Sequence, residues 1–271
     1  MKEANVKRAM AALGLEHRIV GLKFLDFKED YEAKDLPGPE KFGPLCYQVR
    51  TAMDGRHFKC KEEDVSCDYA RYAIGLTKPD PTIVWGRSYH HCGLYETNAI
   101  AREITAAMKF IDQEIYGIEI GPLETMDDAD VVIIAAYAET VMRIMQSYAY
   151  KYGEPKHLCF YGNQAMCSDM VAKPYTNNDI NVSLMCKGMR SRGRFDRGEL
   201  SVAFPINMFD NIVDGIVKTI NPVNTLVEKR AIIERLESPE EMGIEFDMNY
   251  AYGLGLKEYD GRVCEIRAKN K

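Results

Sequence analysis

The stretch DVVIIAAYAETVMRIMQSYAYKYG, residues 130–153, indicates most clearly how this chain folds. Its first part, VVIIAAY, is an unbroken apolar run of the kind found in strands that are buried on both faces. From residue 139 to residue 152 the apolar residues recur at helical spacing, and Gly153 and Pro155 end that pattern. A buried strand that leads directly into an amphipathic helix predicts a sheet covered by helices.

Other segments repeat this alternation of strand and helix. Residues 19–27 (IVGLKFLDF) are expected to form a mostly buried strand, and residues 46–55 (CYQVRTAMDG) a helix that Gly55 ends. We expect a short strand at residues 81–85 (PTIVW), followed by a loop that carries His90, His91 and Cys92. Further strands are predicted at HLCFYG, NVSLMC and ELSVAFP, residues 157–162, 181–186 and 199–205. The predicted class is α/β or α+β, a mixed sheet with flanking helices.

The length of 271 residues suits one large domain. We expect residues 1–225 to form that domain and residues 226–271 to form a C-terminal extension packed on it. Two diverged halves, residues 15–125 and 126–225, are possible, related by a pseudo-twofold axis. Each has an apolar strand, a helix ended by glycine and then two cysteines, so that Cys67 and Cys167 take equivalent places. The same repeated pattern also arises from simple alternation of strands and helices, without any duplication.

Composition and charge narrow the function classes. A formal net charge of −6 argues against general nucleic-acid binding. No apolar run approaches the roughly 18 residues that a membrane span requires, and the first residues read as an amphipathic helix rather than a signal peptide. We therefore expect a cytoplasmic protein with no membrane partner.

Eight cysteines in such a chain are unlike a disulfide framework, because cytosolic thiols are kept reduced. No CxxC pair occurs, so a metal site must be assembled from separate loops. GxGxxG, Walker, GxSxG and HExxH motifs are absent as well. The sequence therefore gives no support for Rossmann-type cofactor binding, P-loop chemistry, serine hydrolysis or zincin proteolysis. The cysteines are Cys46, Cys60, Cys67, Cys92, Cys159, Cys167, Cys186 and Cys264.

The ordered strings LCYQVRTAMDG, EEDVSCDYARYAIGL, VVIIAAYAETVMRIMQ, YGNQAMCSDMVAKPY, NVSLMCKGMR and GELSVAFP resemble the prokaryotic family called Uncharacterised ArCR, a domain of unknown function. The likeness runs from about residue 15 to about residue 220. It implies a distribution among anaerobic archaea and bacteria and no settled activity. Where relatives often carry consecutive acids, this chain has Arg197, Gly198 and Glu199. The cysteines that match the recurring ones of the family are Cys46, Cys67, Cys167 and Cys186.

These four cysteines each stand at a junction, just before a helix or at a strand end, where the loops of such folds build sites. Four converging thiolates suit an iron–sulfur cluster, of the 4Fe-4S type, with structural zinc as the weaker choice because zinc usually takes a close pair of ligands. The leading hypothesis is a redox protein of anaerobic metabolism. A metal-free small-ligand or metal-carrier protein with cysteines as core residues, and thiol redox chemistry at Cys67 or Cys167, stay open.

A run of arginines follows Cys186. Guanidinium groups bind phosphate and carboxylate, so Arg190 and Arg192 are predicted to bind an anion. The expected partners are a redox protein or a small anionic substrate, and the chain is compatible with a homo-oligomer. His90, His91 and Cys92 are either metal ligands or an ordinary loop. Whether the protein is an enzyme stays undetermined at this level.

Overall fold

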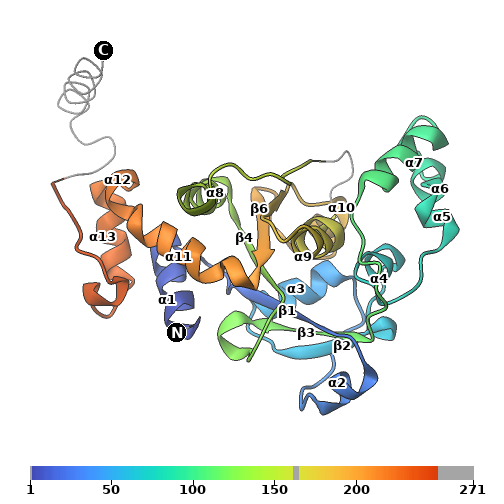
Figure 1. The fold of residues 1–271 in the computed structure, drawn as a ribbon, viewed down its shortest axis with the longest axis horizontal. Helices are drawn as coiled ribbons and strands as arrows, with labels where there is room; N and C mark the ends of the chain where they lie inside the picture. Colours follow the sequence, from blue (N-terminus) through green and yellow to red (C-terminus); the bar gives the residue numbers. More distant parts are fainter. Residues whose placement is uncertain (1, 161–164, 250–271) are drawn as a thin grey trace.

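A computed structural model describes residues 2–160 and 165–249, which form one six-stranded sheet with helices on both of its faces (Figure 1). The predicted combination of a sheet and flanking helices is confirmed. Every pairing between the six strands is antiparallel, so the class name α+β describes the fold best. Among the residues described, no helix has both the length and the apolar character to cross a membrane.

The strands are short and the helices are of very different lengths. The strands are β1 (Val20–Leu25), β2 (Phe58–Lys61), β3 (Gly117–Pro122), β4 (Val131–Tyr137), β5 (Asn181–Ser183) and β6 (Glu199–Pro205). The α-helices are α1 (Lys2–Leu13), α2 (Lys28–Ala33), α3 (Leu45–Met53), α4 (Asp68–Ala73), α5 (Pro81–Val84), α6 (Arg87–His91), α7 (Asn98–Ala107), α8 (Ala138–Tyr152), α9 (Lys173–Asn177), α10 (Lys187–Ser191), α11 (Phe209–Lys218), α12 (Ile220–Val223) and α13 (Leu226–Glu234). Short turns are η1 (Glu62–Asp64), η2 (Leu123–Thr125), η4 (Ile206–Met208), η5 (Pro239–Met242) and the π-helical η3 (Cys167–Ala172).

Strand order across the sheet is β2-β3-β1-β4-β6-β5. The central pair is β1 with β4, in which Val20 lies opposite Ile133 and Leu22 opposite Val131. Successive residues of a strand point to opposite faces, so an unbroken apolar run such as VVIIAAY requires cover on both sides. That requirement explains why β4 lies in the interior of the sheet.

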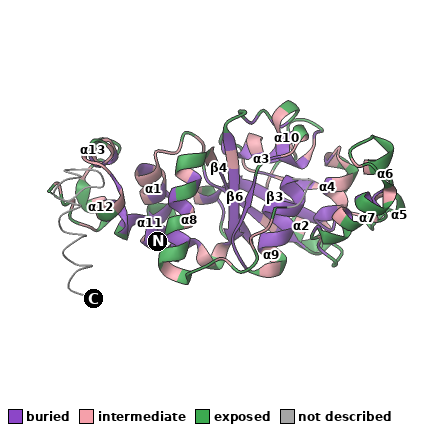
Figure 2. Ribbon diagram, turned by 90° about the horizontal axis from the view of Figure 1, so that it is seen from above, coloured by how far each residue is buried: buried purple, intermediate pink, exposed green. Residues whose placement is uncertain are grey.

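The two faces of the sheet support separate hydrophobic cores. One core contains Leu22 and Ile133 and is covered by α3, α4, η3 and α10. The other contains Val132 and Phe204 and is covered by α1, α8 and α11. Figure 2 shows the strands as the most buried part of the molecule, while α5, α6 and α7 form a largely exposed group at one end.

Three local expectations are corrected by the structure. Residues 81–84 form helix α5 instead of a strand, because Asp80 accepts a hydrogen bond from the backbone N–H of Thr82 and Pro81 occupies the first turn. His90 and His91 lie on helix α6, not on an extended loop. Residues 157–160 are not a strand; the backbone N–H of His157 donates to the carboxylate of Asp179 at 3.2 Å instead of to a neighbouring strand.

The described part of the C-terminal segment packs on the first helix. Helix α13 contacts α1, and the guanidinium of Arg235 donates to the backbone carbonyl of Ala11 at 2.7 Å. Lys7 forms an ion pair with Glu241 at 3.2 Å. Residues 250–271, and Cys264 with them, lie outside the described residues.

The central strand gives a direct test of the core. Leu22 on β1 is fully buried, so Leu22→Ala is expected to lower the free energy of unfolding by about 2–5 kcal/mol in urea denaturation. Val227→Ala removes a side chain that is 75% exposed and should change it by less than about 0.5 kcal/mol. Equal effects of the two substitutions would contradict the placement of β1 at the centre.

Candidate functional site

Each of the four family-like cysteines lies at the start of a helix. Cys46 is the second residue of α3, and Cys167 is the first residue of η3. Cys67 and Cys186 are the residues that immediately precede α4 and α10. The backbone N–H groups of a first helical turn have no partner within the helix, so a sulfur at this place is close to hydrogen-bond donors.

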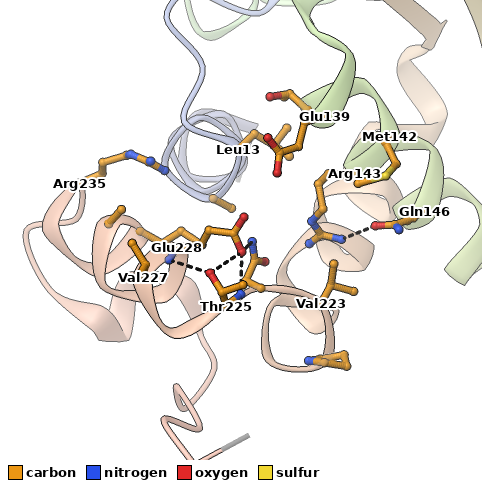
Figure 3. Close-up of a pocket in the computed structure, with 16 residues that line it drawn as sticks. Leu13, Glu139, Met142, Arg143, Gln146, Val223, Thr225, Val227, Glu228 and Arg235 are labelled. Carbon is orange, nitrogen blue, oxygen red and sulfur yellow. Dashed lines mark hydrogen bonds between the residues drawn. The ribbon is translucent and has the colours of Figure 1, made fainter. Parts of the chain in front are cut away.

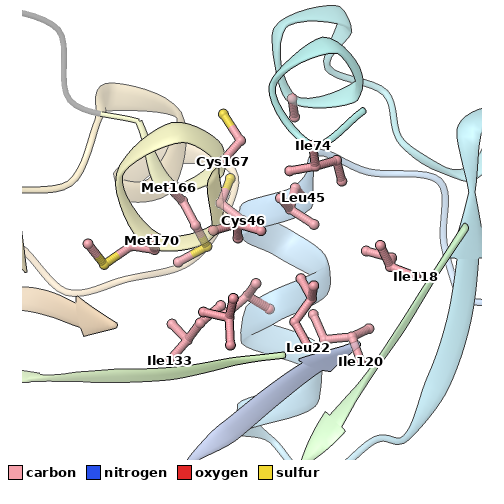
Figure 4. Close-up of a cluster of buried hydrophobic side chains, with 14 of the residues drawn as sticks. Leu22, Leu45, Cys46, Ile74, Ile118, Ile120, Ile133, Met166, Cys167 and Met170 are labelled. Carbon is pink, nitrogen blue, oxygen red and sulfur yellow. The ribbon is translucent and has the colours of Figure 1, made fainter. Parts of the chain in front are cut away.

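The fold brings these four cysteines into one place, which we call the thiol cluster. Cys46 and Cys167 belong to the same buried core, and Cys67 and Cys186 pack against that core. Helix α4 contacts η3, and α10 contacts α3. Figure 4 shows Cys46 and Cys167 above the strand residues, with their sulfur atoms directed to the same side. The structure therefore places all four cysteines in or against one core.

The charges of the cluster members act on one another. Burial, followed by negative charge on Cys186 and on Cys67, raises the pKa of Cys46 to about 12. Burial also holds the pKa of Cys167 well above its ordinary value, with Cys67 and Cys186 as the next causes. Such effects act only between near neighbours. Cys67 and Cys186 are thus close enough to Cys46 and Cys167 that their ionisation disfavours ionisation of those two thiols.

Backbone donors oppose this increase. N–H groups of Gly188 and Met189 face the sulfur of Cys186 and lower its pKa, although burial, the largest cause, keeps the pKa above the ordinary value. The N–H of Ser168 does the same for Cys167, and that of Tyr47 for Cys46. Without a metal the thiols of Cys46, Cys167 and Cys186 stay protonated at neutral pH, while a bound cationic centre would find hydrogen-bond donors already in place.

Apolar side chains surround the deeper half of the cluster. Met166, Met170 and Ile74 lie beside Cys46 and Cys167 in the same core (Figure 4). Cys46 and Cys167 are only 7% and 6% exposed, whereas Cys67 and Cys186 are partly exposed. The cluster therefore has an inner, dry side and an outer side that solvent reaches.

In the described part of the chain, no three His, Cys, Asp or Glu side chains are close enough to hold a metal ion. Four thiolates on a single zinc stand about 2.3 Å from the metal, and hence about 4 Å from each other. An iron–sulfur cluster contains several metal ions, so its cysteine ligands are spread more widely.

The other cysteines among the described residues and the two adjacent histidines lie outside the thiol cluster. Cys60 is buried in β2, and Cys92 is exposed after α6. Cys159 has its thiol 3.5 Å from the carbonyl oxygen of His157. The ring of His90 is 3.2 Å from the carbonyl oxygen of Tyr95, as in an ordinary surface turn.

Arg190 is engaged within the chain. Its guanidinium donates to the backbone carbonyls of Leu184 at 2.9 Å and Glu199 at 2.7 Å, and also to that of Asp196. It thereby ties the loop after Cys186 to β6. Arg192 is exposed. The anion-binding role predicted for both arginines therefore suits Arg192 better than Arg190.

A buried ion pair that the sequence did not reveal supports the Cys167 segment. Lys173 is 1% exposed and lies 3.2 Å from the carboxylate of Asp169, one helical turn earlier. The same carboxylate accepts the backbone N–H of Ala165 at 2.8 Å and the hydroxyl of Ser183 at 3.0 Å. These bonds hold the π-helical turn in place, and such turns are frequent at functional sites. Its only sequence signal is an acid and a lysine four residues apart.

A pocket of about 810 Å³ lies away from the thiol cluster, among α1, α8 and the α12–α13 segment (Figure 3). Arg143 contributes to its wall and donates to Gln146 at 3.2 Å and to the hydroxyl of Thr219 at 3.1 Å. Burial lowers the pKa of this guanidinium. The helices that form the pocket cover the opposite face of the sheet, so it is not an entrance to the cysteines.

Arg190 and Arg192 form a matched pair for a test. Arg190→Ala should lower the free energy of unfolding by about 1–2 kcal/mol, because three backbone carbonyls lose a donor. Arg192→Ala, at an exposed position, should change it by less than about 0.5 kcal/mol in the same urea titration. A larger loss for Arg192 would mean that the loop is held differently.

The buried thiols predict a pH dependence of the metal-free protein. The pKa of Cys46 rises from 9.0 to about 12 on folding, so between these pH values the unfolded chain has lost a proton that the folded chain keeps. Its contribution to stability is complete below pH 9 and falls as the pH rises toward 12. Cys46→Ala should therefore show a shallower decline in denaturation midpoint over this range, and parallel curves would contradict the burial of Cys46.

Comparisons with known proteins agree with the resemblance seen in the sequence. A protein of Methanocaldococcus jannaschii, described as uncharacterised, is 26% identical over 216 residues, which cover 78% of this chain and 92% of the relative. No solved structure matches. Residues 9–215 match the family described as Uncharacterised ArCR, and the chain belongs to that family.

Proposed function

We propose that this protein binds an iron–sulfur cluster, of the 4Fe-4S type, through Cys46, Cys67, Cys167 and Cys186, and that it serves as a cytoplasmic redox protein of anaerobic metabolism. The observation that carries the proposal is the convergence of four cysteine-bearing helix starts on one core. The anaerobic setting comes from the family resemblance.

The electrostatics of the thiol cluster support this choice. A cluster with four thiolates carries net negative charge, which backbone N–H groups at helix starts stabilise. The N–H groups facing Cys186 are those of Gly188 and Met189. Hydrogen bonds to the sulfurs and an apolar surrounding are also the features by which proteins set the reduction potential of such a centre.

The outer side of the cluster is where electrons or a substrate would arrive. Cys67 and Cys186 are partly exposed, and Arg192 and Arg197 are exposed on the loop that follows Cys186. This basic loop suits an acidic face of a redox partner or a small anionic substrate. When bound, the cluster would supply one-electron chemistry; the chain would hold it, shield its inner side and attract the anion.

The test is the metal content of protein purified without oxygen. Wild type should contain iron and acid-labile sulfide and show the visible absorbance of thiolate-bound iron. Serine at each of the four cluster cysteines should reduce the iron content strongly. Cys92→Ser and Cys159→Ser are the matched controls, because their thiols lie outside the thiol cluster, and both should retain it.

Circular dichroism of each variant separates loss of the cluster from loss of the fold. Wild type without iron and sulfide would refute the proposal, and zinc without sulfide would replace the cluster with a structural ion. Full iron content in all four serine variants would show that other residues hold the centre.

A further inference from the structure

The order of strands in the sheet repeats itself outward from the centre. The first half of the chain contributes β1, β2 and β3, and the second contributes β4, β5 and β6. Reading outward from the central β1–β4 pair, the first half gives β1, β3, β2 and the second gives β4, β6, β5. Each half thus places its first strand inside, its third next and its second at the edge.

The registers of the two halves also correspond. Val20 lies opposite Ile133, and Leu22 opposite Val131, so exchanging Val20 with Val131 and Leu22 with Ile133 returns the same pairs. An antiparallel pair that maps onto itself in this way has a local twofold axis between its strands. The axis is perpendicular to the sheet and passes between β1 and β4.

The same exchange carries the inner strands onto one another. In the first half Val20 pairs with Pro122, and in the second Val131 pairs with Pro205. Both prolines end their strands, and a 3-10 turn follows each. The next residues then make equivalent bonds: the N–H of Leu123 donates to Ile19 at 2.8 Å, and that of Ile206 donates to Asp130 at 3.0 Å.

The edge strands complete the correspondence. Phe58 pairs with Ile120 in the first half, and Asn181 pairs with Ala203 in the second. Carried through β3 and β6, this register equates Cys60 with Ser183. All six strands therefore obey one exchange of halves, without a shift of register.

The four cluster cysteines also correspond in pairs when the two halves are exchanged. Cys46 and Cys167 each lie in the first turn of the helical segment that precedes the edge strand, and Cys67 and Cys186 each precede the helix that follows it. Burial agrees with this pairing, because Cys46 and Cys167 are 7% and 6% exposed while Cys67 and Cys186 are both intermediate. The equivalents are thus Cys46 with Cys167 and Cys67 with Cys186, which corrects the expected equivalence of Cys67 and Cys167.

The contacts between the two halves also correspond when the halves are exchanged. Helix α4 of the first half touches η3 of the second, and α10 of the second touches α3 of the first. Charge on Cys186 acts on Cys46 as charge on Cys67 acts on Cys167. Likewise, Cys67 acts on Cys46 as Cys186 acts on Cys167.

We infer that the chain consists of two copies of one three-stranded unit, and that the thiol cluster is a metal site on their common axis, to which each unit gives one inner and one outer thiol. The ligand class that fits is a thiophilic centre with twofold symmetry, which accepts two equivalent thiol pairs. The inference rests on the proposed function only for the identity of that centre. Helices α5, α6 and α7 belong to the first unit alone, between α4 and β3.

Cadmium titration of the metal-free protein tests the inference without iron or sulfide. As the chain stands, no three of the thiols are close enough to hold one ion, so a cadmium ion must draw them together. Because cadmium binds thiolates, serine at each cluster cysteine should weaken its apparent affinity by at least about tenfold. The four variants should form two classes, Cys46→Ser with Cys167→Ser and Cys67→Ser with Cys186→Ser, agreeing within about threefold inside each class. Cys92→Ser is the control and should bind as wild type does.

Variants that group by half, with Cys46→Ser like Cys67→Ser and unlike the other two, would overturn the inference. Four variants that bind cadmium as wild type does would overturn it too. Cadmium binding in these two classes by a protein that lacks iron and sulfide would refute the proposed function and leave the symmetric site standing. Iron and sulfide in wild type, with variants that do not form these classes, would support the proposed function and overturn the symmetric site.

Discussion

The antiparallel contact between β1 and β4 is the constraint on which the rest of the structure depends. It joins strands that are about a hundred residues apart in the chain, and each is flanked on its other side by a strand of its own half. Helix α3, which follows β1, and turn η3, which comes after β4 and α8, both cover the same face of this pair. Cys46 and Cys167 come to lie beside each other for this reason.

Sequence patterns located many elements but not their pairing. VVIIAAY was recognisable as a strand because its apolar run is unbroken, and Gly55 marked the end of the helix that carries Cys46. Local propensity misled at residues 81–84, where the β-branched Thr82, Ile83 and Val84 favour a strand and the cap from Asp80 prevails. Strand order and register arise from long-range contacts, which no local pattern encodes.

The candidate site was predictable to the same extent. The resemblance singled out four cysteines from eight, and the sequence placed three of them near helix starts. Cys186 was expected at the end of a strand, whereas the strand ends at Ser183 and Cys186 precedes α10. Which cysteine corresponds to which depended on register and could not be read locally. The buried Asp169–Lys173 pair escaped notice because a charged pair four residues apart usually lies on a helix surface, whereas here it fills the core behind Cys167.

The loop that Arg190 ties to β6 has a consequence for biosynthesis. Cys186 and the strand that anchors its loop are among the last parts of the family domain to leave the ribosome. A nascent chain that has exposed only Cys46 and Cys67 has half of the proposed ligand set and no β4 to pair with β1. Any cofactor must then be inserted after translation of the whole domain, so its delivery would be a separate step from synthesis.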